Sequence, residues 1–304
     1  MSKVSIIVST YSKDRAEHLS ECIASLKRQT LSPAEIILVL DPCPELIDFY
    51  KLKFPDVKIV VSQEPGLSNA RNIGVKNAEG ELIAFIDDDA VADEYWLERL
   101  VKNYEDPEII GVGGQIKPLW KNNPKWFPEE LNWIIGCTYK GFPENQTSIR
   151  NPIGCNMSFR REAFEKVGYF RHDIGRVNRK LLSGEEMEFS VRVLEKIPGS
   201  RIVYEPSAIV YHKIDEKRAN LRYICKRSFY EGFSKALIIS TRKKLSRTLS
   251  TENWYLKYLL KTAIPLRLKR FYKIRSILQI FILLISLLMV SLGFLIGKIM
   301  SLHL

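Results

Sequence analysis

The first 115 residues alternate short apolar runs with segments of helical spacing, and this alternation restricts the fold more than any other feature of the chain. The apolar runs predict strands at residues 4–9, 35–40, 57–61 and 82–86. The intervening periodicity predicts helices at residues 17–29, 46–54 and 68–77. Strands that are apolar on both faces and separated by helices are typical of a parallel sheet. We therefore predict an α/β fold with a Rossmann-like, mainly parallel sheet flanked by helices.

Polar residues follow three of these strands directly. Thr10 and Tyr11 follow the first, Asp41 follows the second, and the acid run Asp87–Asp89 follows the fourth. Ligands of such sheets bind at the carboxyl ends of the strands. Three adjacent carboxylates repel one another unless a cation lies among them, and hard oxygen ligands suit Mg²⁺ or Mn²⁺. A solvated acidic loop is the alternative, but it is less usual directly after a buried strand, so we predict a divalent metal site.

Several motifs together resemble the family 2 inverting glycosyltransferases, which have a GT-A fold. They lie at residues 4–11, 41, 66–74 and 85–89, and continue at 151–161, 184–188 and 212. The resemblance covers roughly residues 3–215, and the motifs are specific jointly rather than singly. It implies that the chain uses a nucleotide-diphosphate sugar as donor.

The resemblance also implies roles for individual residues. The residues implied to contact the uracil and ribose of a UDP-type donor are Thr10, Tyr11, Asp41 and Asp87. Asp89 is implied to bind the metal with support from Asp88, and Arg71 to bind the donor diphosphate. His212 matches a metal or phosphate contact, although a structural histidine is equally expected there. Many family members have two acids where this chain has only Asp41, so the base contacts are less well defined than the metal site.

Glu186 matches the position of the family's general base, within the run Gly184-Glu185-Glu186. An acceptor hydroxyl has to lose its proton as it attacks the anomeric carbon, and a carboxylate can take that proton. Glu185 could raise the pKa of Glu186 by like-charge repulsion. Both glutamates could also stabilise the first turn of the following helix, and the two interpretations are compatible. On the same helix, the spacing of Glu188 and Arg192 predicts an ion pair.

Residues 151–157 resemble the acceptor-facing segment of the family, which gives Asn151, Gly154 and Asn156, together with Glu185, an acceptor-side role. The alternative is an ordinary loop-to-strand turn. Residues 118–143 are rich in aromatic residues and proline. Such side chains can stack on a sugar or enter a membrane interface, but plain packing explains most of them equally well.

The net charge of +11 is concentrated in one short segment. Residues 1–240 hold 34 basic and 34 acidic residues, whereas residues 241–275 hold 11 basic residues and the single acid Glu252. Residues 276–297 then form an uncharged run of 22 residues. As a helix this run spans about 33 Å, enough to cross a bilayer core. A basic stretch beside it indicates contact with anionic membrane lipids rather than with nucleic acid.

The basic flank predicts a single-pass protein of the cell membrane with a cytoplasmic catalytic domain. Residues 254–275 mix aromatic, apolar and basic side chains and are interrupted at Pro265, which is typical of interfacial amphipathic helices. Five cysteines without CxxC spacing predict neither a disulfide framework nor a zinc site, as in a reducing compartment. The N-terminus lacks the apolar core and cleavage site of a signal peptide.

Taken together, these features predict a metal-dependent, inverting hexosyl- or glucuronosyltransferase with a lipid-linked acceptor. The acceptor would be a polyprenyl or dolichyl phosphate, or a glycan carried on one, in the assembly of glycans or N-glycosylation precursors. The layout is similar to archaeal enzymes that extend dolichyl-phosphate-linked glycans. A nucleotidyltransferase acting on a sugar phosphate and a non-catalytic membrane scaffold are the alternatives. The predicted parts are a donor half at 1–115, an acceptor half at 116–220, interfacial helices at 221–275 and a transmembrane helix at 276–297.

Overall fold

A computed structural model describes residues 3–174, 182–240 and 249–301, and its contacts divide the chain into two compact units. The first unit comprises residues 1–117, 144–179 and 185–213, and the second comprises residues 118–143, 180–184 and 214–304. This division reflects packing alone, so the boundaries predicted above for the donor half, the acceptor half and the membrane helices stay predictions. The part of the basic segment at 241–248 lies outside the described residues.

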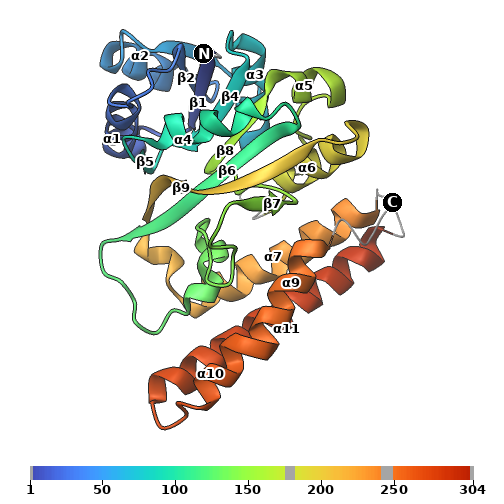
Figure 1. Cartoon of the computed structure of the whole chain (residues 1–304). Helices are drawn as coiled ribbons and strands as arrows, with labels where there is room; N and C mark the ends of the chain where they lie inside the picture. The colour runs from blue at the N-terminus through green and yellow to red at the C-terminus, as the bar shows by residue number, and fades with distance from the viewer. Residues whose placement is uncertain (1–2, 175–181, 241–248, 302–304) are drawn as a thin grey trace. The chain divides into compact units, whose positions relative to one another are not determined.

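The described part of the first unit is built on one sheet of nine strands, which begins with a parallel block (Figure 1). The strands of this block are β1 (Val4–Thr10), β2 (Glu35–Leu40), β3 (Lys58–Val61) and β4 (Leu82–Asp87). Strand β1 lies between β2 and β4, with Thr10 beside Leu40 and Ser9 beside Asp87. The strands predicted from the apolar runs are confirmed, and their carboxyl ends lie at one edge.

The rest of the sheet is antiparallel. Its strands are β5 (Ala90–Ala92), β6 (Ile109–Trp120), β7 (Thr147–Ile149), β8 (Asn156–Arg160) and β9 (Arg201–Ile214). Strand β8 pairs antiparallel with β4 and β6, and β9 pairs antiparallel with β5 and β7. The sheet is therefore mixed rather than mainly parallel. The prediction was based on residues 1–115, where a helix between successive strands makes them parallel. Within the described part of the chain, the strands that follow β4 are not joined by such crossovers, and they pair antiparallel.

Helices cover the sheet, and an aromatic cluster fixes one of them firmly. The helical elements of this unit are η1 (Lys13–Arg15), α1 (Ala16–Lys27), α2 (Pro44–Lys53), α3 (Leu67–Asn77), α4 (Trp96–Lys102), η2 (Asn103–Glu105), α5 (Arg161–Val167) and α6 (Glu185–Lys196). Phe189 of α6 is fully buried, with its ring centroid 4.6 Å from that of Phe164 and 5.0 Å from that of Phe159. Burying each such ring contributes roughly 1.5–3 kcal/mol. The predicted Arg192–Glu188 ion pair is confirmed at 2.9 Å.

The second unit contains the helices of the C-terminal third and the aromatic insertion. Its elements are η3 (Glu129–Ile135), η4 (Glu216–Arg218), α7 (Leu221–Ser240), α9 (Ser250–Tyr258), η5 (Leu259–Ala263), α10 (Ile264–Leu268) and α11 (Ile274–Ser301). In the insertion, Trp133 donates through Nε1 to Tyr255 Oη at 3.2 Å. Tyr255 in turn donates to the carbonyl oxygen of Glu130 at 2.8 Å. These aromatic residues therefore pack within the unit, as the plain-packing alternative expects.

The predicted interruption at Pro265 is wrong. The backbone is helical from Ser250 to Leu268, and the π-helix η5 ends at Ala263, two residues before the proline. The amide of Ile264 donates to the carbonyl of Leu259, five residues back. This wider turn shifts the hydrogen-bond register, and Pro265 then lies in the first turn of α10, where a missing amide hydrogen is tolerated.

Candidate active site

Polar residues at the ends of β1 and β4 meet at one edge of the parallel block. Thr10 ends β1 and Asp87 ends β4. Strand β9 brings His212 to the same edge, because His212 pairs with Ala90, the residue that follows the acid run. A residue more than a hundred positions away in the sequence thus joins the carboxylates through strand pairing alone.

Asp87, Asp89 and His212 can each direct one ligand atom into a common space. These ligand atoms lie within 4.8 Å of one another. Nε2 of His212 is 3.1 Å from Oδ1 of Asp89, and both residues are buried. Carboxylates suit Mg²⁺ or Mn²⁺, and an imidazole adds a ligand that transition metals accept more readily than Mg²⁺ does. The residues present therefore fit a divalent cation.

Arg15, at the end of η1, is a site residue that was not predicted from the sequence. Its guanidinium donates to Asp88 Oδ1 and, at 3.1 Å, to Asp89 Oδ2, and it lies 5.0 Å from the centroid of the Tyr11 ring. Burial acts to lower the pKa of Arg15, but the charges of Asp88 and Asp89 outweigh it and raise that pKa. Burial raises the pKa of Asp88 to about 6, against the opposing charge of Arg15. The sequence feature that could have indicated this role is a basic residue, Arg15, just before the first long helix after β1.

Arg71, from α3, joins three other predicted site residues. Its guanidinium lies 2.9 Å from Glu185 Oε1, 3.1 Å from the carbonyl oxygen of Gly154 and 3.5 Å from Asp87 Oδ1. Arg71 and Glu185 are both buried. A Cβ on residue 154 would come within 2.8 Å of the guanidinium, so a larger residue there would have to displace this buried arginine. Glu185, predicted on the acceptor side, is thus paired with Arg71, which was predicted to bind the donor.

Glu186 lies beside Glu185 in the first turn of α6, but in different surroundings. It is half-buried, whereas Glu185 is buried. Gly184, directly before the helix, has a φ of +99°, which favours glycine and turns the chain into α6. With α6 fixed through Phe189, the Glu186 side chain starts from a rigid position. Of the two adjacent acids, Glu186 is therefore the more accessible to an acceptor.

The predicted donor-base residues lie at the ends of β1 and β2. Thr10 is buried and Tyr11 is 63% exposed. Asp41 is half-buried, and its backbone amide donates to the carbonyl of Thr10 at 3.4 Å. Burial raises the pKa of the Asp41 carboxyl, and a hydrogen bond from the backbone of Gly66 opposes the rise. Asp41 thus links the end of β2 to the glycine that precedes α3.

The surroundings of Asn156 favour a structural role over the acceptor-side role predicted for it. The side chain is completely buried: it accepts from Trp96 Nε1 at 2.8 Å and donates to the carbonyls of Gln115 and Ala208 at 3.0 and 2.9 Å. These bonds tie α4, β6 and β9 to β8, so Asn156 holds the sheet together. Asn151 is half-buried and donates to the carbonyl of Pro152 at 2.9 Å, leaving its acceptor-side role a prediction.

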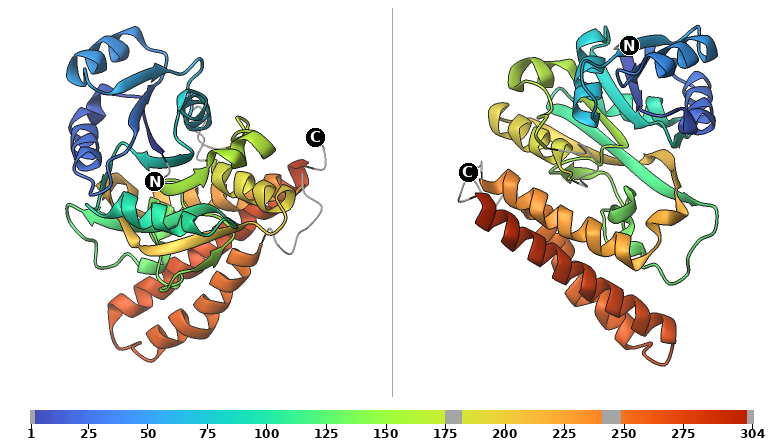
Figure 2. Two further views of the ribbon diagram at one scale, coloured as in Figure 1. Left: turned by 45° about the horizontal axis from the view of Figure 1, so that its top comes forward. Right: turned by 180° about the vertical axis from the view of Figure 1, so that it is seen from behind.

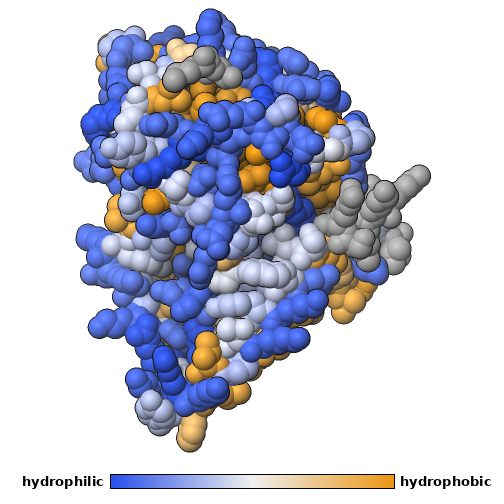
Figure 3. Space-filling view, in the orientation of Figure 1, coloured by the Kyte–Doolittle hydropathy of each residue, from blue (hydrophilic) through white to orange (hydrophobic). Residues whose placement is uncertain are grey.

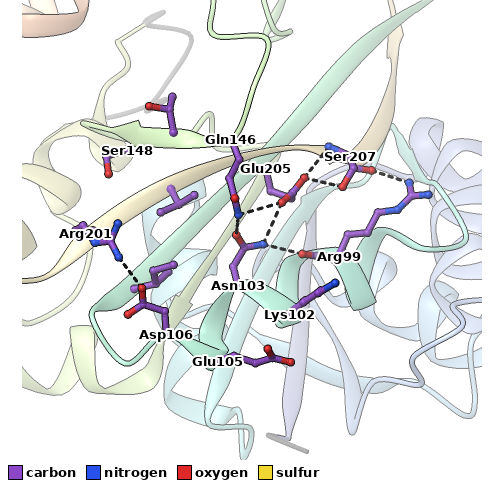
Figure 4. Close-up of a pocket in the computed structure, with 13 residues that line it drawn as sticks. Arg99, Lys102, Asn103, Glu105, Asp106, Gln146, Ser148, Arg201, Glu205 and Ser207 are labelled. Carbon is purple, nitrogen blue, oxygen red and sulfur yellow. Dashed lines mark hydrogen bonds and ion pairs between the residues drawn. The ribbon is translucent and has the colours of Figure 1, made fainter.

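A cavity of about 600 Å³ lies toward the other end of β9 from His212 (Figure 4). Arg99, Lys102, Asn103, Glu105, Asp106, Ile109, Gln146, Thr147, Ser148, Arg201, Val203, Glu205 and Ser207 line it. Within it, Gln146 donates to Glu205 at 3.3 Å, and Glu205 also accepts from Ser207. At roughly 3.3 Å per strand residue, even Ser207 lies about 17 Å along β9 from His212. The cavity contains none of the predicted site residues and is separate from the carboxylate edge.

The comparison with known families decides the class of the protein. The family model described as glycosyl transferase family 2 matches residues 5–168. The chain belongs to glycosyltransferase family 2. It is 36% identical over 284 residues to the glucosyl-dolichyl phosphate glucuronosyltransferase of Haloferax volcanii, and the match covers 91% of this chain and 90% of that protein.

Solved structures show the same fold for this glycosyltransferase. The mannosyltransferase PcManGT from Pyrobaculum calidifontis, in complex with GDP-Man and Mn²⁺, aligns with a TM-score of 0.61 at 18% identity, over 97% of this chain and 87% of that one. GalNAc-T7 with UDP, GalNAc and Mn²⁺ aligns with a TM-score of 0.55 at 16% identity, over 86% of this chain and 57% of that one. Both neighbours are GT-A-like, in agreement with the predicted fold class.

Proposed function

We propose that this glycosyltransferase moves a sugar, with inversion, from a nucleotide diphosphate to an acceptor carried on dolichyl or another polyprenyl phosphate. The observation that carries the proposal is the meeting of Asp87, Asp89 and His212 within 4.8 Å at the edge where the donor-base residues lie. The name of the Haloferax relative makes a glucuronosyl donor and a glucosyl-dolichyl phosphate acceptor the first pair to test. A UDP-sugar in the assembly of an N-glycosylation precursor is the corresponding finer proposal.

In this mechanism Glu186 accepts the proton of the acceptor hydroxyl. The acceptor oxygen forms a bond to the anomeric carbon while the bond from that carbon to the diphosphate oxygen breaks, so the configuration inverts and the nucleoside diphosphate leaves. Asp87, Asp89 and His212 would hold a divalent cation, which when bound offsets the charge that develops on the leaving diphosphate. Imidazole ligation favours Mn²⁺ over Mg²⁺ in this set. Thr10, Tyr11 and Asp41 line the end of the sheet where the base and ribose would lie.

The Arg71–Glu185 pair positions the site rather than reacting in it. Each partner is buried and ionic, so the pair fixes the start of α6 against α3 and keeps Asp87 at the edge of the sheet. Because Glu186 follows Glu185 in α6, the pair would also restrict where the Glu186 carboxylate lies relative to Asp87, as proton transfer during attack requires. The catalytic unit is proposed to work at the cytoplasmic membrane face with α11 as its anchor, either by crossing the bilayer or by lying in its surface.

The test is transfer from labelled nucleotide sugars by the full-length protein in membranes. UDP-glucuronic acid, UDP-glucose and GDP-mannose are offered in turn, with dolichyl phosphate and glucosyl-dolichyl phosphate as acceptors, in the presence of MnCl₂ or of EDTA. We expect transfer that requires the cation and yields a product of inverted anomeric configuration. The Asp89→Asn variant serves as the inactive control. Transfer that is unaffected by EDTA and by Asp89→Asn would overturn the proposed metal site.

A further inference from the structure

Helices α7 and α11 lie side by side and run parallel within the second unit (Figures 1 and 2). Ser228 and Ser286 share a buried hydrogen bond of 2.8 Å. Further along both helices, a Cβ added to Gly293 would lie 1.9 Å from the carbonyl oxygen of Phe229, and one added to Gly232 would meet the backbone of α11 equally closely. The two backbones therefore touch along a line of small residues.

This contact line extends over most of α11. Near its start, Gln279 donates to the carbonyl of Lys125 at 3.3 Å and accepts from Arg267 at 3.0 Å. Near its end, Gly297 lies against Phe233 and Ala236. Arg267 is also paired with the buried Glu130 at 2.6 Å. One face of α11 thus packs against the rest of the second unit, through a polar side chain near its start and against small and aromatic residues of α7 further along.

The opposite face of α11 is apolar and exposed. Its residues, all between 42% and 67% exposed, are Ile277, Leu278, Phe281, Leu284, Leu288, Leu292 and Leu295. Only 28% of the most apolar 18-residue stretch of α11 is buried, whereas the core helix of a soluble domain would be mostly buried. An apolar face of this length has to be covered by lipid or by another protein surface.

Helix α11 could either cross the bilayer or lie in its surface, and the charged residues of α7 favour the second arrangement. Glu231 of α7 is paired with Arg227 and with Lys235 of the same helix, each at 2.8 Å. These three residues lie in the part of α7 that packs against residues 286–297 of α11. Lys226, one turn earlier, is exposed. A helix that crossed the hydrocarbon core with this neighbour attached would carry these charges to bilayer depth, where lysine, arginine and glutamate are strongly disfavoured.

The turn between α10 and α11 is suited to a membrane surface. All of residues 269–275 are exposed, and they alternate basic side chains with Phe271, Tyr272 and Ile274. In Figure 3, the end of the molecule where α10 meets α11 shows hydrophilic and hydrophobic side chains next to one another. Cations among aromatic and aliphatic side chains bind anionic headgroups while the apolar groups enter the interface.

We infer that α11 lies in the plane of an anionic membrane, attached to α7, with both of its ends on the same side of the bilayer. Taken alone, α11 has the composition of a transmembrane helix; together with α7 it forms one amphipathic body with a charged inner side and an apolar outer side, as interfacial helices do. This arrangement replaces the single-pass crossing predicted from the sequence. It is independent of the proposed function, because it rests only on contacts within the second unit.

The sidedness of α11 can be tested with single cysteines in the full-length protein. Tyr272→Cys and Met300→Cys, placed in a chain with Cys225→Ser, are reconstituted into sealed vesicles that contain phosphatidylglycerol and are exposed to a membrane-impermeant maleimide. The exposed native Cys43 reports the side on which the first unit lies. We expect positions 272 and 300 to react on the side of Cys43, without detergent, at rates within about threefold of one another. Reaction of Met300→Cys only after detergent is added would overturn the inference.

A second pair of cysteines tests what covers the apolar face. Leu288 is 67% exposed on α11 and Leu52 is 85% exposed on α2 of the first unit, so neither substitution disturbs packing. In the same vesicles we expect Leu288→Cys to react at least tenfold more slowly than Leu52→Cys. Membrane binding should also fall at least tenfold in vesicles of phosphatidylcholine alone. Equal labelling of the two cysteines, or disulfide-linked dimers through residue 288, would place water or a second copy on this face and refute the inference.

Discussion

Glu185 and Glu186 are adjacent, yet the structure predicts different consequences for changing each to glutamine. Glu185 is buried against Arg71 at 2.9 Å, and removing one member of such a pair leaves an uncompensated buried charge. Breaking a buried pair costs about 3–5 kcal/mol, and the amide retains one hydrogen bond, so we expect Glu185→Gln to cost about 3 kcal/mol. For a unit of this size that loss lowers the unfolding midpoint by roughly 6–12 °C.

Glu186→Gln should instead leave the midpoint within about 2 °C of the unmodified protein, because the residue is half-buried at a helix start. Its effect is expected in the transfer rate, which should fall by about 10²–10⁴-fold with the loss of a general base. Thermal unfolding followed by circular dichroism gives the midpoints. Initial transfer rates are measured well below the lower midpoint, so that unfolding does not enter.

A double-mutant cycle completes the test of the pair. Arg71→Met and Glu185→Leu should each destabilise the protein, but the double variant should be less destabilised than the sum by about 2 kcal/mol, because neither charge is left alone. An unchanged midpoint for Glu185→Gln combined with a hundredfold loss of activity would refute the reasoning. It would identify Glu185, not Glu186, as the residue that takes the proton.

Three further predictions concern other parts of the site. His212→Ala should raise the Mn²⁺ concentration for half-maximal transfer by at least about tenfold, measured in a metal titration with Asp89 intact. Asn156→Ala should cost about 3 kcal/mol in urea unfolding, because it strands buried partners that include the Trp96 indole, whereas Asn151→Ala should cost less than about 0.5 kcal/mol. Since burial raises the pKa of Asp41, its ionisation opposes folding; Asp41→Asn should therefore unfold at a higher temperature than the unmodified protein at pH 7. That difference should shrink as the pH falls through the raised pKa, and donor titration should show weaker binding at pH 7.

The parallel block could be predicted closely because its information is local. Strand β2 was predicted at residues 35–40, where it occurs, because an apolar run this short between turn residues is typical of a buried strand. The acid run ends such a strand, so its place at the sheet edge followed directly. The antiparallel half could not be predicted in the same way, because short strands such as β5 and β7 exist only through pairing with β9.

The surroundings of Arg15 and Asn156 could not be predicted for one physical reason, which is their dependence on distant partners. Arg15 becomes a site residue only when Asp88 and Asp89, more than seventy positions away, fold beside it. Asn156 looks like an acceptor-facing polar residue until its hydrogen bonds to α4, β6 and β9 are formed. A sequence pattern gives the residue types. Tertiary packing determines whether a polar side chain is exposed for binding or buried with all its hydrogen bonds formed inside the protein.

The charges of the site explain why cation and donor should bind together. Asp87–Asp89 and Glu185 bring four carboxylates, and their direct ion pairs with Arg15 and Arg71 supply two positive charges. Counted over these six side chains alone, two negative charges remain, which is the charge that one divalent cation offsets. A donor diphosphate adds further negative charge at the same edge, where the low dielectric strengthens repulsion. Because Arg71 is already paired with Glu185 and Asp87, we expect a cation between Asp87, Asp89 and His212 to provide most of the attraction for the diphosphate.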